Sequence, residues 1–142
     1  MNYVLLTNQN DALIPDILSC YKIPSVAQFI SIDETNYWNY VTSTDNVWFY
    51  KILEEDCLVS TIHLELNDDI LYMDVVVLPK YQKKGIATKI LNDIKSGKLG
   101  IDFNKIKISV DERNIASIKL FENAGFVLIG KDDELFEYEY KK

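Results

Sequence analysis

The sequence predicts an α+β or α/β fold, a mixed sheet of about seven strands with helices packed on it. Residues 57–66 and 70–78 form a clear pair of strands, and residues 85–98 repeat apolar side chains at helical spacing. The predicted elements follow one another in the order β-α-α-β-β-β-α-β-α-β-β, which argues against a helical bundle or a barrel. At 142 residues, 48% of them hydrophobic, the chain is long enough for one domain over residues 1–142.

Each element follows from its local pattern. In the first half, short apolar runs predict strands at Tyr3–Leu6 and Val47–Leu53, and apolar residues at helical spacing predict a helix over Asp11–Tyr21 and a helical region over 24–44 that is broken near Ile32–Asp33. In the second half, the same signals predict a helix over Gly85–Lys98, a strand over Lys105–Val110, a helix over Ile115–Ala124 that Gly125 closes, and strands over Phe126–Gly130 and Leu135–Tyr140.

The register of the central hairpin can be predicted as well. Apolar residues alternate with polar ones along 57–66, whereas 70–78 is apolar almost throughout, as expected of a strand covered on both faces. A turn on Asp68-Asp69 makes the numbers of facing residues sum to 137, so that His63 faces Asp74. A three-residue turn would set His63 against Met73 and mix polar with apolar side chains on one face, so the first register is favoured.

Composition limits the classes of partner. The net charge of −7 argues against a nucleic-acid partner, because such binding depends on neutralised phosphates. Neither an apolar run of membrane-spanning length nor a signal peptide is evident. The two cysteines, Cys20 and Cys57, are too few for a disulfide framework, and we expect a cytoplasmic protein. The charge is uneven: residues 79–98 carry +5 and the remainder −12, which indicates an anion site within a surface that favours cations.

The basic segment has the pattern of a phosphate site. A buried strand ends at Pro79, a lysine-rich turn follows, and a helix begins at once after Gly85. The first N–H groups of a helix have no partner inside the helix and lie at its positive end, and a glycine there lets a ligand approach the backbone. The alternative is an ordinary strand–turn–helix joint with solvated lysines. Neither the nucleotide P-loop nor the dinucleotide-binding glycine pattern is present.

Two motifs resemble those of the GNAT superfamily of N-acetyltransferases. The segment Gln82-Lys83-Lys84-Gly85-Ile86-Ala87 is similar to the family's [RQ]-x-x-G-x-[GA] signature, and a strand ending Val77-Leu78-Pro79 precedes it. Residues 108–110 and 114–126 resemble the family's second motif, L-x-V followed by N-x-x-A-x-x-L-[YF]-x-x-x-G-F. Together the matches cover roughly residues 47–140, and the first 45 residues fit the family by position only.

The resemblance implies a fold and a co-substrate. The fold would have a mostly antiparallel central sheet with helices on both faces, splayed between strands 70–78 and 105–110. Acetyl-CoA would place its pyrophosphate on the backbone N–H groups of Lys83–Thr88 and its pantetheine along Val75–Val77, and the N–H of Val77 would stabilise the oxyanion. The implied cofactor-binding residues are Val75, Val76, Val77, Gln82, Lys83, Lys84, Gly85, Ile86, Ala87, Thr88, Asn114, Ala116 and Phe121. No metal site is expected.

Catalytic residues are less clearly marked. The family often takes a general acid from a tyrosine in the second motif, but Phe121 stands at that position and has no proton to give. Candidates for the general base are Asp74, the one acid in its apolar strand, and His63, the only histidine, although either could be structural. The aromatic cluster of Tyr37, Trp38 and Tyr40 could line an acceptor site, but a core role is favoured.

Two functions are therefore compared. The main prediction is acetyl transfer from acetyl-CoA to a primary amine of a small molecule or peptide, by direct attack. The alternative is a CoA-binding sensor that has lost the chemistry, which Phe121 would favour. We expect neither nucleic acid nor membrane as a partner, and an edge strand near the C-terminus could pair two copies into a homodimer.

Overall fold

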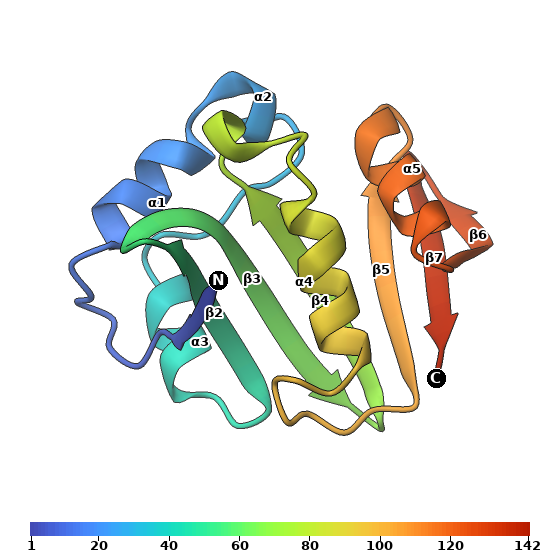
Figure 1. The fold of residues 1–142 in the computed structure, drawn as a ribbon, viewed down its shortest axis with the longest axis horizontal. Helices are drawn as coiled ribbons and strands as arrows, with labels where there is room; N and C mark the ends of the chain where they lie inside the picture. Colours follow the sequence, from blue (N-terminus) through green and yellow to red (C-terminus); the bar gives the residue numbers. More distant parts are fainter. The chain divides into compact units, whose positions relative to one another are not determined.

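A computed structural model describes residues 1–142, and hydrogen bonds join its seven strands in the order β1-β2-β3-β4-β5-β7-β6 (Figure 1). The pairings at β1–β2, β2–β3, β5–β7 and β6–β7 are antiparallel, and β4–β5 is parallel, so the sheet is mixed as predicted. The chain forms two compact units, residues 1–65 with 74–84 and residues 66–73 with 85–142, so strand β4 (Ile70–Val77) contributes to both. None of the helices combines the length and hydropathy that crossing a bilayer requires.

The first unit holds the N-terminal strands and helices. Its strands are β1 (Asn2–Leu5), β2 (Val47–Glu54), most of β3 (Cys57–Asn67) and the second half of β4. Its helices are α1 (Ile14–Tyr21), α2 (Pro24–Ala27) and α3 (Tyr37–Ser43), so the predicted helical region over 24–44 is two short helices separated by a break wider than expected. Their buried side chains share one apolar cluster with the sheet, formed by Leu6, Ile14, Ile17, Cys20, Tyr21, Val26, Trp38, Val41 and Phe49.

The second unit contains the remaining elements. They are two helices and three strands from the second half of the chain: α4 (Ile86–Lys95), β5 (Lys105–Asp111), α5 (Ile115–Asn123), β6 (Val127–Asp132) and β7 (Leu135–Lys141). Helix α4 buries Ile90, Leu91 and Ile94, the apolar face that its spacing predicts, and a left-handed Gly97 follows its end. Each predicted element is therefore present, with bounds that differ by a few residues.

The central hairpin has the predicted register. Asp68 and Asp69 both have positive φ, 51° and 63°, which is the conformation of a two-residue hairpin turn. At the far end, the N–H of Leu78 donates to the carbonyl oxygen of Val59 across 2.9 Å, and these numbers again sum to 137. The expectation that both faces of β4 are covered is wrong, because Tyr72 is 40% exposed while Leu71 and Met73 are buried.

Candidate active site

The parallel pairing of strand β4 with β5 covers the first residues of β4. It runs from Ile70↔Lys105 to Tyr72↔Lys107 and so ends before Val75–Val77. Further along, Leu78 donates its N–H to β3, and backbone groups of successive residues point to opposite edges of a strand. The N–H groups of Val75 and Val77 therefore point away from β3. Val75, Val76 and Val77 are half-buried, so this stretch offers a partly apolar edge with backbone donors.

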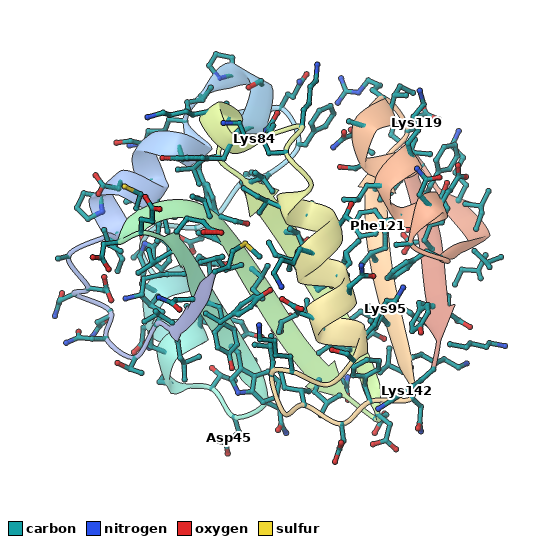
Figure 2. The ribbon with its side chains drawn as sticks, viewed as in Figure 1. Asp45, Lys84, Lys95, Lys119, Phe121 and Lys142 are labelled. Carbon is teal, nitrogen blue, oxygen red and sulfur yellow. The ribbon has the colours of Figure 1, made fainter.

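The turn after β4 is fastened to the strand it leaves. A short 3-10 helix, η1 (Pro79–Tyr81), begins the turn, and the side-chain amide of Gln82 donates to the carbonyl oxygen of Val77 across 3.0 Å. The ammonium groups of Lys80 and Lys84 stand 5.6 and 5.9 Å from the centre of the Tyr81 ring. Figure 2 labels Lys84 in this turn. Cation–π contacts with the Tyr81 ring thus keep the charges of Lys80 and Lys84 close together in this turn.

The backbone between Lys83 and Thr88 forms a row of unused donors. Lys83 and Gly85 have φ of 62° and 79°, with Lys84 between them outside the left-handed region. Left-handed residues separated by one of another conformation can turn successive N–H groups toward one point, an arrangement that binds anions. No N–H from Lys83 to Thr88 donates to an acceptor within the chain, and the positive end of the α4 dipole adds to them. The predicted phosphate segment therefore has the donors that a phosphate needs.

The residues of the second motif lie at and along α5. The Asn114 side chain accepts from the N–H of Ser117 across 3.3 Å and so caps the helix, while Ala116 is exposed in its first turn. Phe121, labelled on α5 in Figure 2, is only 7% exposed and packs edge-on against Phe126 at 5.2 Å between ring centres. Phe121 is thus a core residue of the second unit.

The histidine lies within a network that sequence reasoning did not find. The hydroxyl of Tyr37 and Nδ1 of His63 are 2.7 Å apart, and Nε2 lies 3.8 Å from Oε1 of Glu65. Nε2 has no exposed surface and no hydrogen-bond partner. Tyr40 donates its hydroxyl to the same Oε1 of Glu65. Tyr37, Tyr40, His63 and Glu65 are called the tyrosine–histidine cluster below.

The aromatic residues of α3 therefore have divided roles. Trp38 is 7% exposed and packs edge-on against Phe49, as the favoured core reading predicts. Tyr40 is 43% exposed, and its hydroxyl binds Glu65, so the core reading is wrong for this residue. The density of aromatic residues at 37–40 was the only sequence signal for the cluster. Its partners on β3 lie about 25 residues further along the chain.

Asp74 is electrostatically coupled to this cluster. Its side chain reaches solvent, yet most of its surroundings are protein, and desolvation raises the pKa of its carboxyl group. The charge of His63 lowers that pKa and the charge of Glu65 raises it, and the net direction is upward. His63 and Asp74 thus interact as the predicted register implies. A carboxylate with a raised pKa is suited to accept a proton near neutral pH.

Comparison with known proteins confirms the resemblance to the GNAT family that the two sequence motifs indicate. The model of the acetyltransferase (GNAT) family matches residues 13–126. A Vibrio cholerae SpeG–hSSAT chimera of spermidine N-acetyltransferase superposes with a TM-score of 0.79 at 18% identity, over 99% of this chain and 96% of that one. The Campylobacter jejuni N-acetyltransferase PseH, solved with acetyl coenzyme A, gives a TM-score of 0.79 at 14% identity, over 99% and 98%.

A third structure has the same fold. The aminoglycoside acetyltransferase AAC(6')-Ib, solved with coenzyme A and kanamycin, gives a TM-score of 0.79 at 13% identity, over 99% of this chain and 95% of that one. No curated protein matches the chain. At these identities the structural likenesses establish the fold, and the family model adds the sequence match over most of the chain.

Proposed function

Because the chain belongs to the GNAT family of acetyltransferases, we propose that it is an N-acetyltransferase with one acetyltransferase domain over residues 1–142. Acetyl-CoA supplies the acetyl group, and a neutral primary amine of a small molecule or peptide attacks the thioester carbonyl. The C–S bond then breaks, the amide forms, the amine nitrogen loses a proton, and CoA leaves as the thiol or thiolate. The similar structures named for spermidine and aminoglycoside enzymes act on amines, which supports this acceptor class.

The observation that carries the proposal is the row of free N–H donors from Lys83 to Thr88. In this proposal they bind the pyrophosphate, which the lysines of the turn attract from a distance. The pantetheine extends along Val75–Val77 as an added strand, and the N–H of Val77 donates to the thioester oxygen as negative charge develops there. Gln82 keeps the turn against the end of β4 and so holds the donors in place.

In this proposal the residues of the second motif mainly stabilise helix α5, and only Asn114 is expected to contact the cofactor directly. Asn114 uses Oδ1 to cap α5, which leaves its Nδ2 donors for the cofactor, and Ala116 keeps the first turn of the helix small. Phe121 anchors helix α5 in the core of the second unit, because its ring is buried against Phe126. These roles agree with the family motif while assigning Phe121 to the core.

Asp74 is the general base in this proposal and accepts the proton that the amine must lose, directly or through a water molecule. Its raised pKa and its place on β4, one residue before Val75, support this role. No tyrosine stands at position 121 to protonate the leaving sulfur. A thiol with a pKa near 8.5 is a fair leaving group without help, so the reaction does not require that acid.

The proposal is tested in two steps. Acetyl-CoA is titrated by calorimetry and by its effect on thermal unfolding, and a bound co-substrate raises the unfolding temperature. Release of CoA thiol is then followed with polyamines, amino acids, aminoglycosides and short peptides. Binding followed by amine-dependent thiol release supports the enzyme. If acetyl-CoA neither binds nor changes the unfolding temperature, the proposal is wrong.

A CoA-binding sensor is the second candidate, favoured by the missing hydroxyl at Phe121. In that case acetyl-CoA binds as above, but no amine in the panel accelerates thiol release. Saturable amine-dependent turnover excludes the sensor. The net charge of −7 supports an amine as the partner over nucleic acid, and edge strand β6, whose six residues are all exposed, supports a homodimer.

A further inference from the structure

In the tyrosine–histidine cluster, the hydrogen bond of Tyr37 to His63 determines which ring nitrogen of the histidine carries the proton. The Tyr37 hydroxyl has one hydrogen-bond partner, Nδ1 of His63 at 2.7 Å. Burial raises the pKa of Tyr37, and the negative charges of Asp74 and Glu65 raise it further, so the phenol keeps its proton. Nδ1 is the one acceptor of the chain within hydrogen-bond distance of this hydroxyl, so the retained phenol proton favours donation to Nδ1. In the neutral ring, Nδ1 is then the acceptor and the ring proton lies on Nε2.

We infer that Tyr37 is a positioning residue for acetyl transfer, which holds the ring proton of His63 on Nε2 beside Glu65 and thereby leaves Asp74 as the base. The neutral ring has no free lone pair, since that of Nδ1 accepts from Tyr37 and Nε2 bears hydrogen. The Nε2–H of His63 therefore faces Oε1 of Glu65 at 3.8 Å, a favourable electrostatic contact that is longer than a hydrogen bond. This inference rests on the proposed function where it concerns turnover, and on the structure alone where it concerns the ring proton.

Every titratable group that faces the ring belongs to the same arrangement. Helix α3 contributes Tyr37 and Tyr40, β3 contributes Glu65, and β4 contributes Asp74. From α1, Tyr21 binds Thr61 across 2.7 Å and interacts with Asp74. None of these groups is a cation, so the partial positive charge of an Nε2–H group is what offsets the negative charges of Glu65 and Asp74 here. Moving the proton to Nδ1 would leave a ring lone pair facing Glu65, which is unfavourable.

The first test reads the ring directly and needs no turnover. The chain contains one histidine, so nitrogen-15 NMR of the untagged protein reports His63 without assignment. We expect the wild-type ring at pH 8 to be protonated on Nε2 with Nδ1 as acceptor. In Tyr37→Phe, Nδ1 loses its donor, and the signals move toward the average of two exchanging tautomers. Tyr40→Phe is the matched control, because Tyr40 binds Glu65 and leaves the Tyr37–His63 bond intact.

The second test separates positioning from proton transfer. Tyr37→Phe should lower kcat about tenfold with little change in the KM for acetyl-CoA, as expected when one oriented hydrogen bond is lost. His63→Gln retains a donor and an acceptor and should keep more of kcat than His63→Leu. A wild-type ring protonated on Nδ1, an unchanged ring in Tyr37→Phe, or equal loss of kcat in both His63 variants would overturn the inference. Absence of turnover with every amine contradicts the proposed function instead, and the ring measurement still stands.

Discussion

The side-chain amide of Gln82 donates a hydrogen bond to the carbonyl oxygen of Val77 across 3.0 Å. This bond ties the turn that presents the N–H donors to the end of the strand proposed to hold the pantetheine. Gln82, the first residue of the segment 82–87, therefore holds the backbone of the turn in place and does not itself need to contact a phosphate.

Replacing Gln82 by Ala should weaken acetyl-CoA binding about fivefold, the effect of losing one neutral hydrogen bond of about 1 kcal/mol. The measurement is the dissociation constant of acetyl-CoA by calorimetry. Lys119→Ala, on exposed α5 surface, is the control and should bind as the wild type does. Equal affinity in both variants would contradict the role given to Gln82.

Gly85 and Gly97 allow a matched comparison. Both have left-handed φ, 79° and 81°, and a Cβ at either position would meet nothing within 4 Å. Alanine should therefore cost each variant about 1 kcal/mol of unfolding free energy through backbone strain alone. Only Gly85→Ala puts a methyl group beside the N–H donors proposed to bind the pyrophosphate, so only this variant should lose acetyl-CoA affinity, by about tenfold or more. Denaturant unfolding and calorimetry measure the two effects, and an equal loss of affinity at Gly97 would argue against the site.

Asp74→Asn should separate activity from stability. We expect kcat/KM to fall about 10²–10⁴-fold with the loss of a general base. In the wild type, kcat/KM should decline as the pH falls through the raised pKa of Asp74, above the ordinary value of 3.8. A carboxyl group whose pKa is raised by folding stabilises the protein below its unfolded pKa, and this contribution is lost as the pH rises through the folded pKa.

The asparagine variant should therefore unfold at the same or a higher temperature than the wild type at pH 7, since it carries no desolvated charge there. Thermal unfolding at pH 7 and steady-state rates from pH 5 to 9 check both points. A variant that keeps wild-type turnover would exclude Asp74 as the base.

The ion pair between Asp11 and Lys51 should support the first unit. The two charged atoms are 2.5 Å apart, and the side chains are 17% and 10% exposed. Burial by itself raises the pKa of Asp11, but the hydrogen bond from Lys51, the N–H of Leu13 and the charge of Lys51 hold it below 3.8. This stabilisation is present above the unfolded pKa of Asp11 and is lost as the pH falls through the lower folded value.

Asp11→Asn leaves the buried ammonium of Lys51 without a counter-charge and should cost about 3 kcal/mol. The double variant Asp11→Asn/Lys51→Met removes both charges while Met keeps the apolar stem of Lys51, and it should cost less. Urea unfolding of the three proteins at pH 7 gives the comparison. Equal stability of the wild type and Asp11→Asn would show that the pair contributes nothing.

Much of the fold could be predicted because its signals are local. The turn on Asp68-Asp69 sets the hairpin register through its own backbone conformation, and that register brings His63 and Asp74 into one electrostatic group. Likewise, the donors from Lys83 to Thr88 follow from a left-handed glycine and a helix that begins beside it. The capping of α5 by Asn114 also rests on a local preference, since asparagine is a common N-cap residue, but the sequence analysis assigned Asn114 only to the cofactor.

The sequence by itself determined the order of elements, the hairpin register and the row of free N–H donors from Lys83 to Thr88, since each depends on residues within a short stretch of chain. Only the tertiary structure decided what surrounds the histidine. Tyr37 and Tyr40 reach β3 because α3 packs beside β2, and no local spacing predicts which hydroxyl meets which partner. The burial of Phe121 against Phe126 has the same origin, since a side chain's exposure is set by what packs on it.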